Sequence, residues 1–208
     1  MQSEKTKYHY FNYFILKNFN PVIRFLTLAD MLIAGGFGLI VPIFAVYITD
    51  NIQSGTVEVV GIASTIFLLT KCLLQIAVGA IIDKYKSEYD DFFCLLAGSI
   101  IYSIIPLFYI FVTTPFQLYL AQFVYGLAAA FAYPTWMSIF TRHIDRDKEG
   151  VEWSIYATFT EFGMAIAASL GGFVAYRYGF KLLFVVASII IFLSSLSIIA
   201  IYNKIRSR

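Results

Sequence analysis

Long apolar stretches separated by short polar ones make up most of the chain. An α-helix rises ~1.5 Å per residue, so about 20 apolar residues are enough to cross the ~30 Å hydrocarbon core of a bilayer. Six stretches reach that length, at about residues 22–48, 59–82, 92–112, 116–140, 151–175 and 180–201. The pattern therefore predicts an all-α integral membrane protein, a bundle of six transmembrane helices.

The second stretch carries one charged side chain near its middle. On a helix, Ser64, Lys71, Gln75 and Gly79 share one face, because steps of seven and four residues return to the same side. A lysine at the centre of a spanning helix costs roughly 2.5–3.5 kcal/mol on insertion scales if lipid surrounds it. Lys71 is therefore expected to face protein or water rather than lipid.

Composition supports the membrane assignment. Of the 208 residues, 60% are hydrophobic and 13% are charged, and the mean hydropathy is +0.76, whereas soluble domains are ~45–50% apolar and about a quarter charged. The net charge of +2 is too small to indicate nucleic-acid binding. Cys72 and Cys94 both lie in apolar stretches, so neither a disulfide framework nor a metal site is indicated, and no cofactor is expected.

Lysine and arginine lie almost entirely on one side of the predicted bundle. Arg177 and Lys181 fall on the other side, and Lys71 lies within a span. The remaining twelve share the first side: Lys5, Lys7, Lys17, Arg24, Lys84, Lys86, Arg142, Arg146, Lys148, Lys204, Arg206 and Arg208. Because basic residues concentrate in cytoplasmic loops, both termini are predicted to be cytoplasmic, and the protein to span the plasma or inner membrane several times.

The two ends of the chain are polar. Residues 1–21 are predicted to form a cytoplasmic arm, and its aromatic residues leave two alternatives open, a short interfacial helix or a loose tail. Residues 203–208 are predicted to form a basic cytoplasmic tail. The membrane domain between these ends is expected to cover residues 22–202.

The order of features repeats after about 93 residues. In the first and fourth spans, small residues precede Pro42 and Pro134, which are expected to kink their helices. The second and fifth spans end in matching glycine-containing turns. An odd number of helices separates the copies, so residues 22–112 and 116–202 are predicted to be inverted-topology repeats of three helices each. Such repeats are typical of secondary transporters.

The turn after the second span resembles a signature motif of the major facilitator superfamily. The family motif runs Gly-x-x-x-Asp-Arg/Lys-x-Gly-Arg-Arg/Lys, and this chain has Gly79, Asp83 and Lys84 in the matching places. It departs from the motif afterwards, with Lys86 where the second glycine is expected and two non-basic residues following.

Two further stretches are similar to motifs of the same family. In the fourth span, Gln122 replaces the arginine of an Arg-x-x-x-Gly motif that ends at Gly126. In the fifth span, Gly163, Ala167 and Gly171 resemble a loose version of the glycine-rich motif typical of antiporters. With the helix number, the orientation and the repeat, the chain resembles one six-helix half of a family whose members normally have twelve helices in two halves.

The resemblance implies a transporter that moves a small solute by alternating access, with or without coupling to protons. Such a half needs a partner, either a second six-helix half or a second copy of this chain. Two alternatives stay open: a truncated fragment of a twelve-helix transporter, and a non-transporting membrane scaffold or sensor. An enzyme is not expected, because His9 and His143 lie outside the spans and no Gly-x-Ser-x-Gly motif occurs.

Three ionisable residues inside the spans are candidates for a substrate or proton pathway. Lys71 and Glu161 lie ~15 Å from the predicted cytoplasmic ends of their helices, and Asp30 is shallower. In the resembled family, the spans that hold them line the central cavity. Gln75 and Gln122 face inward by their pattern, and either could also contact substrate. Glu161 could then exchange a proton and pair with Lys71. The alternative is that Lys71 only neutralises a buried carboxylate and that the glutamines only form hydrogen bonds between helices.

The resemblance also places Gly79, Asp83 and Lys84 at a cytoplasmic gate, where the family's aspartate contacts the partner half. The alternative is an ordinary solvated turn. Small residues at four-residue spacing let helix backbones approach closely. Five are expected to serve in helix packing: Gly126, Gly163, Ala167, Gly171 and Gly172. Three aromatic residues near span ends are expected to belong to an aromatic belt at the membrane surface: Trp136, Trp153 and Tyr47.

Overall fold

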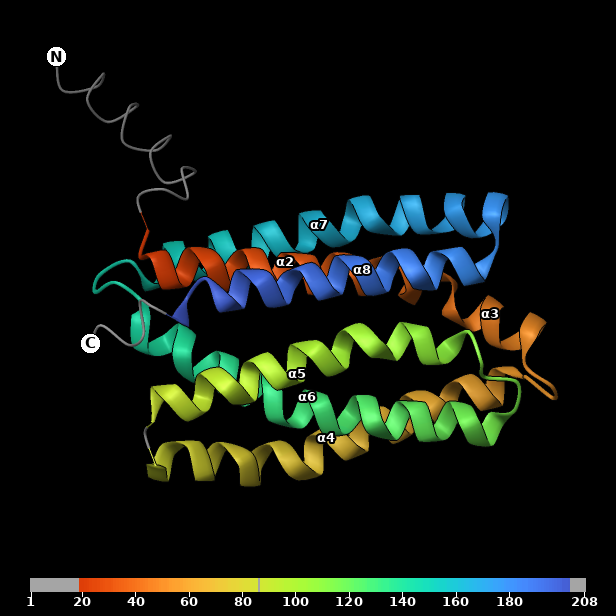
Figure 1. Cartoon of the computed structure of the whole chain (residues 1–208), viewed down its shortest axis with the longest axis horizontal. Helices are drawn as coiled ribbons and strands as arrows, with labels where there is room; N and C mark the ends of the chain where they lie inside the picture. The colour runs from red at the N-terminus through yellow and green to blue at the C-terminus, as the bar shows by residue number, and fades with distance from the viewer. Residues whose placement is uncertain (1–18, 86, 203–208) are drawn as a thin grey trace, which may run out of the picture.

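A computed structural model describes residues 19–85 and 87–202, which form seven α-helices and one short 3-10 helix (Figure 1). The elements are α2 (Pro21–Ile40), η2 (Val41–Ile43), α3 (Phe44–Asn51), α4 (Val57–Tyr85), α5 (Glu88–Tyr109), α6 (Pro115–His143), α7 (Glu149–Tyr178) and α8 (Phe180–Ile199). Within these residues, six segments are long and apolar enough to cross a membrane, the first of them combining α2, η2 and α3. The prediction of an all-α, six-helix membrane bundle is confirmed. Most of the predicted arm and all of the predicted tail lie outside the described residues.

Local sequence explains where several helices begin and end. The Asn20 side chain accepts a hydrogen bond from the backbone N–H of Val22 (3.0 Å) and so caps α2. Thr114 and Gln117 form a reciprocal capping box at the start of α6. The first span breaks at Pro42, which lies in η2 between α2 and α3. Proline supplies no backbone N–H donor, so the α-helical hydrogen bonding is interrupted there.

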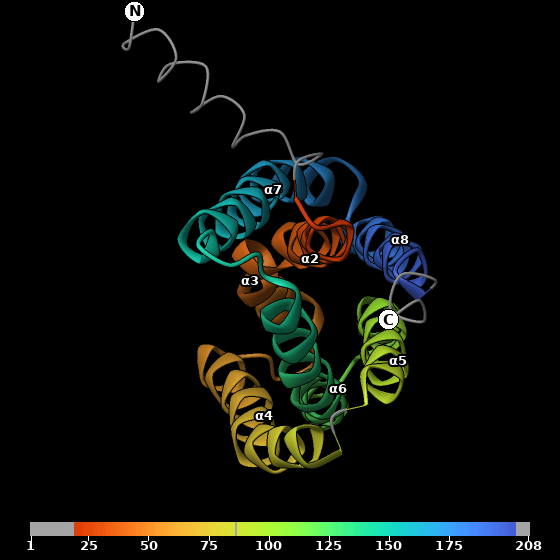
Figure 2. The ribbon, with the colours of Figure 1, turned by 90° about the vertical axis from the view of Figure 1, so that its left-hand side faces the viewer.

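The helices pack in two groups, α2 with α7 and α8, and α6 with α4 and α5, as the view along the bundle shows (Figure 2). Contacts of α5 with α8 and of α2 with α6 join the groups. The main contacts correspond between the predicted repeats: α2 packs on α7 as α6 packs on α4, and α2 packs on α8 as α6 packs on α5. The α7–α8 contact has no counterpart of similar extent between α4 and α5 in the described residues. The division into two three-helix repeats stays a prediction.

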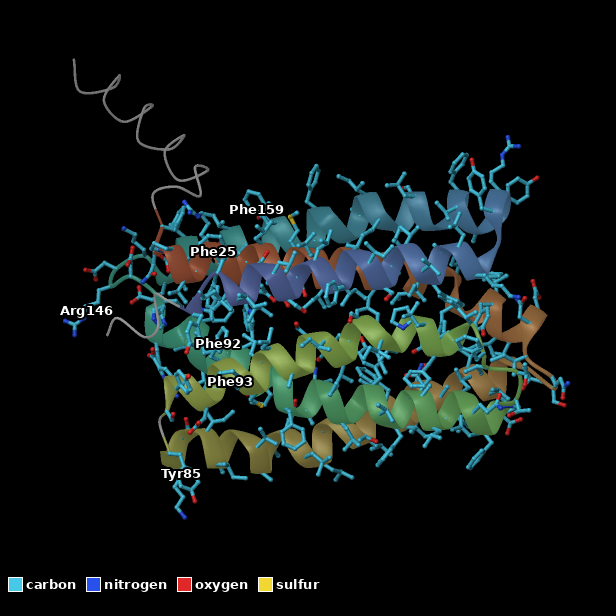
Figure 3. All side chains as sticks on the ribbon, viewed as in Figure 1. Phe25, Tyr85, Phe92, Phe93, Arg146 and Phe159 are labelled. Carbon is cyan, nitrogen blue, oxygen red and sulfur yellow. The ribbon has the colours of Figure 1, made fainter. Side chains whose placement is uncertain are left out.

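Two buried clusters fill the ends of the bundle. One end, where Tyr85 and Arg146 lie, is called the basic end, and the opposite end is called the distal end (Figure 3). The cluster of the distal end includes Tyr47, and that of the basic end includes Trp136. These two side chains are only 4% and 6% exposed, so the expectation that they form an aromatic belt is wrong. Their rings pack against neighbouring aromatic rings inside the bundle, at 4.8 Å between centroids in each case.

Two helices on the flanks remain mostly uncovered. In the apolar part of α4, 6% of the residues are buried inside the bundle, and in that of α7, 17%. In the other four spans, this share is 39–50%. As the second and fifth spans, these two helices occupy equivalent places in the two predicted repeats. The bundle therefore offers two matching faces to lipid or to another protein.

Candidate functional site

Lys71 lies half-buried on α4, with its Nζ 4.2 Å from the centre of the Tyr133 ring on α6. This is a cation–π contact, in which the ring face attracts the ammonium. Among residues 19–85 and 87–202, no ion pair within 4.0 Å includes Lys71. The structure therefore brings Lys71 to an aromatic ring rather than to Glu161 or Asp30.

Asp30 lies half-buried on α2 and accepts a hydrogen bond from the Tyr156 hydroxyl on α7. It also borders a cavity of about 40 Å³ that Ser99, Tyr102 and Tyr133 help to line. Tyr133 therefore lies between the surroundings of Asp30 and the ammonium of Lys71. The hydrogen bond ties α2 to α7 and occupies one carboxylate oxygen of Asp30.

Glu161 and Gln75 have no hydrogen bond or ion pair to another side chain in the described part of the chain. Glu161 is exposed on α7, and Gln75 is half-buried on α4, one turn after Lys71. Both side chains belong to the two flanking helices that the bundle leaves uncovered. They are available to water, to a solute or to another protein.

Gln122 is 5% exposed on α6, and its Nε2 donates to the Tyr109 hydroxyl at 3.1 Å. It borders a pocket of about 360 Å³ between α2, α3, α4 and α6, called the aromatic pocket. The aromatic pocket is lined by Phe37, Ile40, Val41, Phe44, Ala45, Val60, Ser64, Phe67, Leu68, Tyr109, Gln122 and Tyr125. Its volume is in the range typical of small-molecule sites.

Three rings from three helices stack along the wall of the aromatic pocket. Tyr125 of α6 stacks on Phe37 of α2, with 4.8 Å between centroids and 16° between planes. It also stacks on Phe67 of α4, at 4.3 Å and 24°. Tyr102 meets Tyr125 edge-on at 5.6 Å. The two phenylalanines cover both faces of Tyr125, so the stack forms a continuous apolar wall against which an aromatic or aliphatic group can pack.

Lys71 lies on α4, just beyond the part of this helix that lines the aromatic pocket. Ser64 and Leu68 line the pocket, and Lys71 comes seven and three residues later, so it shares their side of the helix. On α6, Tyr133 comes eight residues after Tyr125, which is ~12 Å along the helix. The cation thus lies beyond the pocket toward the basic end.

The gate candidates lie on a second opening, at the basic end. A groove of about 400 Å³ between α4 and α6 is lined by Gly79, Ile82, Asp83, Pro134, Met137, Ser138, Thr141 and Arg142. Lys84 is exposed, with its Nζ 5.6 Å from the ring of Tyr85. Arg142 donates to Asp91 of α5 at 2.7 Å, and the Asp91 side chain is 5% exposed. Asp83 therefore shares a groove with an arginine that is already paired to another carboxylate.

The small residues that were expected to serve in helix packing differ in their surroundings. A side chain at Gly171 would meet the backbone of Leu39, and one at Gly126 would lie 2.7 Å from Thr70. Gly163 lies against Met31, with 3.0 Å from an added Cβ to the Met31 side chain. Ala167, on the same face, is 7% exposed. Gly172 and Gly79 have no atom of another element within 4 Å of an added Cβ, so no close approach within this chain requires them to be glycine.

Several residues of the site were not singled out from the sequence. Tyr133 and Tyr156 are the partners of Lys71 and Asp30, and Phe37 and Tyr125 build the aromatic pocket. Each is an aromatic residue inside an apolar span, a type that is common there. One signal was present in the sequence: Gln122, Tyr125 and Tyr133 all lie on the same helix, at spacings of three and eight residues.

Comparison with known proteins identifies the family. A sequence model described as the Major Facilitator Superfamily matches residues 26–207. A protein of Methanocaldococcus jannaschii, described as an uncharacterized MFS-type transporter, is 28% identical over 184 residues. This alignment covers 88% of the chain and 45% of the relative, so the chain spans about half the length of the curated relative it matches. With its six apolar spans and a family match over most of its length, the chain is a multi-pass membrane protein that belongs to the major facilitator superfamily, a family of membrane transporters.

Proposed function

We propose that the chain acts as one half of a transporter that moves a small solute across a cell membrane by alternating access. The observation that carries the proposal is the aromatic pocket, a space of about 360 Å³ on the first, second and fourth spans, with Lys71 beyond it. A mostly apolar pocket with a few polar groups is the usual form of a small-molecule site. Gln122 and Ser64 supply polar groups at its wall.

The second opening of the bundle supports alternating access. The groove at Gly79 and Asp83 lies at the basic end, whereas the aromatic pocket lies toward the distal end. Lys84, Arg142 and their basic neighbours support an orientation with the basic end in the cytoplasm, by the positive-inside rule. On this orientation, the aromatic pocket faces the outer half of a plasma or inner membrane, and the Asp83 groove serves as the cytoplasmic gate.

The uncovered faces of α4 and α7 are the proposed contact surfaces for a second six-helix unit. Each flanking helix packs on one main neighbour, α4 on α6 and α7 on α2, and leaves the rest of its surface uncovered. Both carry polar groups at mid-span, Lys71 and Gln75 on α4 and Glu161 on α7. A second half would enclose these groups in a shared cavity. The M. jannaschii relative is long enough to contain two such halves, since the aligned region is 45% of it.

Proton coupling, if the transporter uses it, is assigned to Glu161. Its carboxylate is exposed at mid-span and has no side-chain partner in the described residues, whereas Asp30 is held by Tyr156. Ionisable groups inside a membrane commonly serve ion pathways. A Glu161→Gln variant is then expected to exchange solute across the membrane but to lose uptake driven by a pH gradient.

Uptake into proteoliposomes tests the proposed function. The full chain is reconstituted, a defined mixture of small metabolites is added outside, and the solutes that enter are measured by mass spectrometry against protein-free liposomes. Native mass spectrometry of the same preparation identifies the second half that accompanies the 23.5 kDa chain. At least one solute is expected to enter, and the Lys71→Met variant to take up less of it. An assembled complex that admits no solute faster than protein-free liposomes would exclude transport and favour a membrane sensor.

A further inference from the structure

The geometry points to an elongated organic anion as the ligand: its anionic group binds Lys71, and its apolar or aromatic body occupies the aromatic pocket. This inference rests on the proposed function, because it names the substrate class of the same site. It combines the electrostatic surroundings of Lys71, the chemistry of the pocket wall and the distance between them.

The first step is the missing counter-charge of Lys71. Its ammonium is half-buried at mid-span, where a charge requires a partner or water. The Tyr133 ring, 4.2 Å away, supplies a partial negative face and no full charge. No carboxylate of the described residues lies within 4.0 Å, and Asp30, beyond Tyr133, is engaged by Tyr156. An anion at Lys71 would complete the site.

The second step is the apolar character of the aromatic pocket. Phe37, Tyr125 and Phe67 form a continuous stack along its wall. Two polar groups at the wall are engaged within the chain: the Ser64 hydroxyl donates to the Val60 carbonyl at 3.0 Å, and the Gln122 amide donates to Tyr109. The pocket is therefore suited to the apolar part of a ligand, and a second charge there would have no partner.

The third step is the distance between the two subsites. The aromatic pocket and the ammonium lie on the same side of α4, and the rings that mark them on α6, Tyr125 and Tyr133, are ~12 Å apart along the helix. A compact anion would reach Lys71 without covering the aromatic stack. A ligand with its charge at one end and an apolar body of several carbon atoms would reach both.

A binding experiment with one anion and its neutral analogue tests this inference. The full chain, in lipid nanodiscs, is titrated with radiolabelled 4-phenylbutyrate, and 4-phenylbutanamide and acetate are used as competitors. We expect saturable binding of the anion and at least tenfold weaker competition by the amide, since a charge-assisted contact is lost. Acetate is expected to compete weakly, because it cannot cover the stacked rings.

Variants at position 71 test whether the ammonium of Lys71 binds the anionic group of the ligand. Lys71→Met is expected to weaken binding roughly 10- to 100-fold, while Lys71→Arg keeps the charge and should stay within about fivefold of the wild type. Lys181→Met, an exposed lysine at the distal end of α8, is the matched control and should bind normally. A melting curve is recorded for each variant, so that a loss of binding can be distinguished from a loss of structure.

Three results would overturn the inference: no saturable binding of 4-phenylbutyrate, equal binding of the amide, or unchanged binding by Lys71→Met. The last result would mean that the second half supplies the counter-charge of Lys71. These outcomes are separable from the proposed function. Uptake of a neutral or cationic solute would preserve transport and exclude the anion, whereas Lys71-dependent binding without any uptake would preserve the anion site and exclude transport.

Discussion

The pair α2–α7 and the pair α4–α6 correspond to each other in the two predicted repeats but are packed differently. Along α2–α7, glycines meet the facing helix at several levels, Gly38 against Met164, Gly163 against Met31 and Gly171 against Leu39. Along α4–α6, the close approach of Gly126 is confined to the distal half, and at the basic end the helices border the groove of about 400 Å³. Figure 1 shows the ends of α4 and α6 well apart there.

Individual glycines on α7 and α4 show how the two helix pairs differ. Gly171 is pressed against the backbone of Leu39, whereas nothing lies within 4 Å of a Cβ at Gly79. Gly172, which comes 93 residues after Gly79 and matches it in the predicted repeat, is likewise free of close contacts. Gly171 thus holds α7 close to α2, whereas Gly79 makes no close approach that would hold α4. A rigid pair beside a movable one is the arrangement that a gate at Asp83 would require.

The largest expected effect is at Arg142, which holds α6 to α5 at the groove. Arg142→Met would leave the carboxylate of Asp91, 5% exposed, without its partner at 2.7 Å. Loss of one member of a buried ion pair is expected to lower the free energy of unfolding by about 3 kcal/mol. Chemical unfolding in a fixed detergent measures it. The double variant Asp91→Leu, Arg142→Met should recover most of the loss, and a double variant as unstable as the single one would contradict this account.

The next largest loss of unfolding free energy is expected at Gly171, in contrast to Gly79. Gly171→Ala places a methyl group against the backbone of Leu39, which cannot give way as a side chain can. We expect a loss of about 2–3 kcal/mol from overpacking. Gly79→Ala should change the free energy of unfolding by less than ~1 kcal/mol, toward higher stability, because alanine favours helix. Gly172→Ala is a second control beside Gly171 and is expected to behave like Gly79→Ala. Equal losses at the three positions would remove the distinction between the helix pairs.

A smaller difference is expected between Gly126 and Gly163, which lie at the close approaches of the two pairs. An alanine at Gly126 would lie 2.7 Å from the Cβ of Thr70 and 2.8 Å from the carbonyl oxygen of Phe67, both fixed to the backbone. An alanine at Gly163 would meet the flexible side chain of Met31 at 3.0 Å. Gly126→Ala should therefore cost about 1–2 kcal/mol and Gly163→Ala less than ~1 kcal/mol. Thermal melting of the two variants in the same detergent decides the order, and the reverse order would contradict it.

The sequence was sufficient for the six spans, because the length of an apolar run and the thickness of a bilayer are local and directly comparable. It was not sufficient for the partners of the charges. Lys71 meets Tyr133 because α4 and α6 are held in register where Gly126 packs against Phe67 and Thr70. That register joins residues more than 50 positions apart and depends on packing rather than on periodicity. Equal depth of Lys71 and Glu161 therefore did not imply contact.

The last comparison is between two tyrosines that tie helices together, Tyr156 between α7 and α2 and Tyr109 between α5 and α6. The Tyr156 hydroxyl donates to Asp30 between α7 and α2, and the Tyr109 hydroxyl accepts from Gln122 of α6. Tyr156→Phe leaves a half-buried carboxyl group without its donor and is expected to cost about 2 kcal/mol. Tyr109→Phe should cost about 1 kcal/mol or less, because Gln122 borders the aromatic pocket, where water can replace the lost hydroxyl.

Chemical unfolding of the two phenylalanine variants measures this difference, and an Asp30→Asn, Tyr156→Phe double-mutant cycle isolates the contact itself. An asparagine at position 30 still accepts a hydrogen bond, so Asp30→Asn alone should cost less than Tyr156→Phe. Non-additive losses in the cycle would show that the hydroxyl and the carboxyl group act as one link between α2 and α7. Equal losses for Tyr156→Phe and Tyr109→Phe would mean that the α2–α7 link is no stronger than the α5–α6 link, and the rigidity of α2–α7 would then rest on its glycines alone.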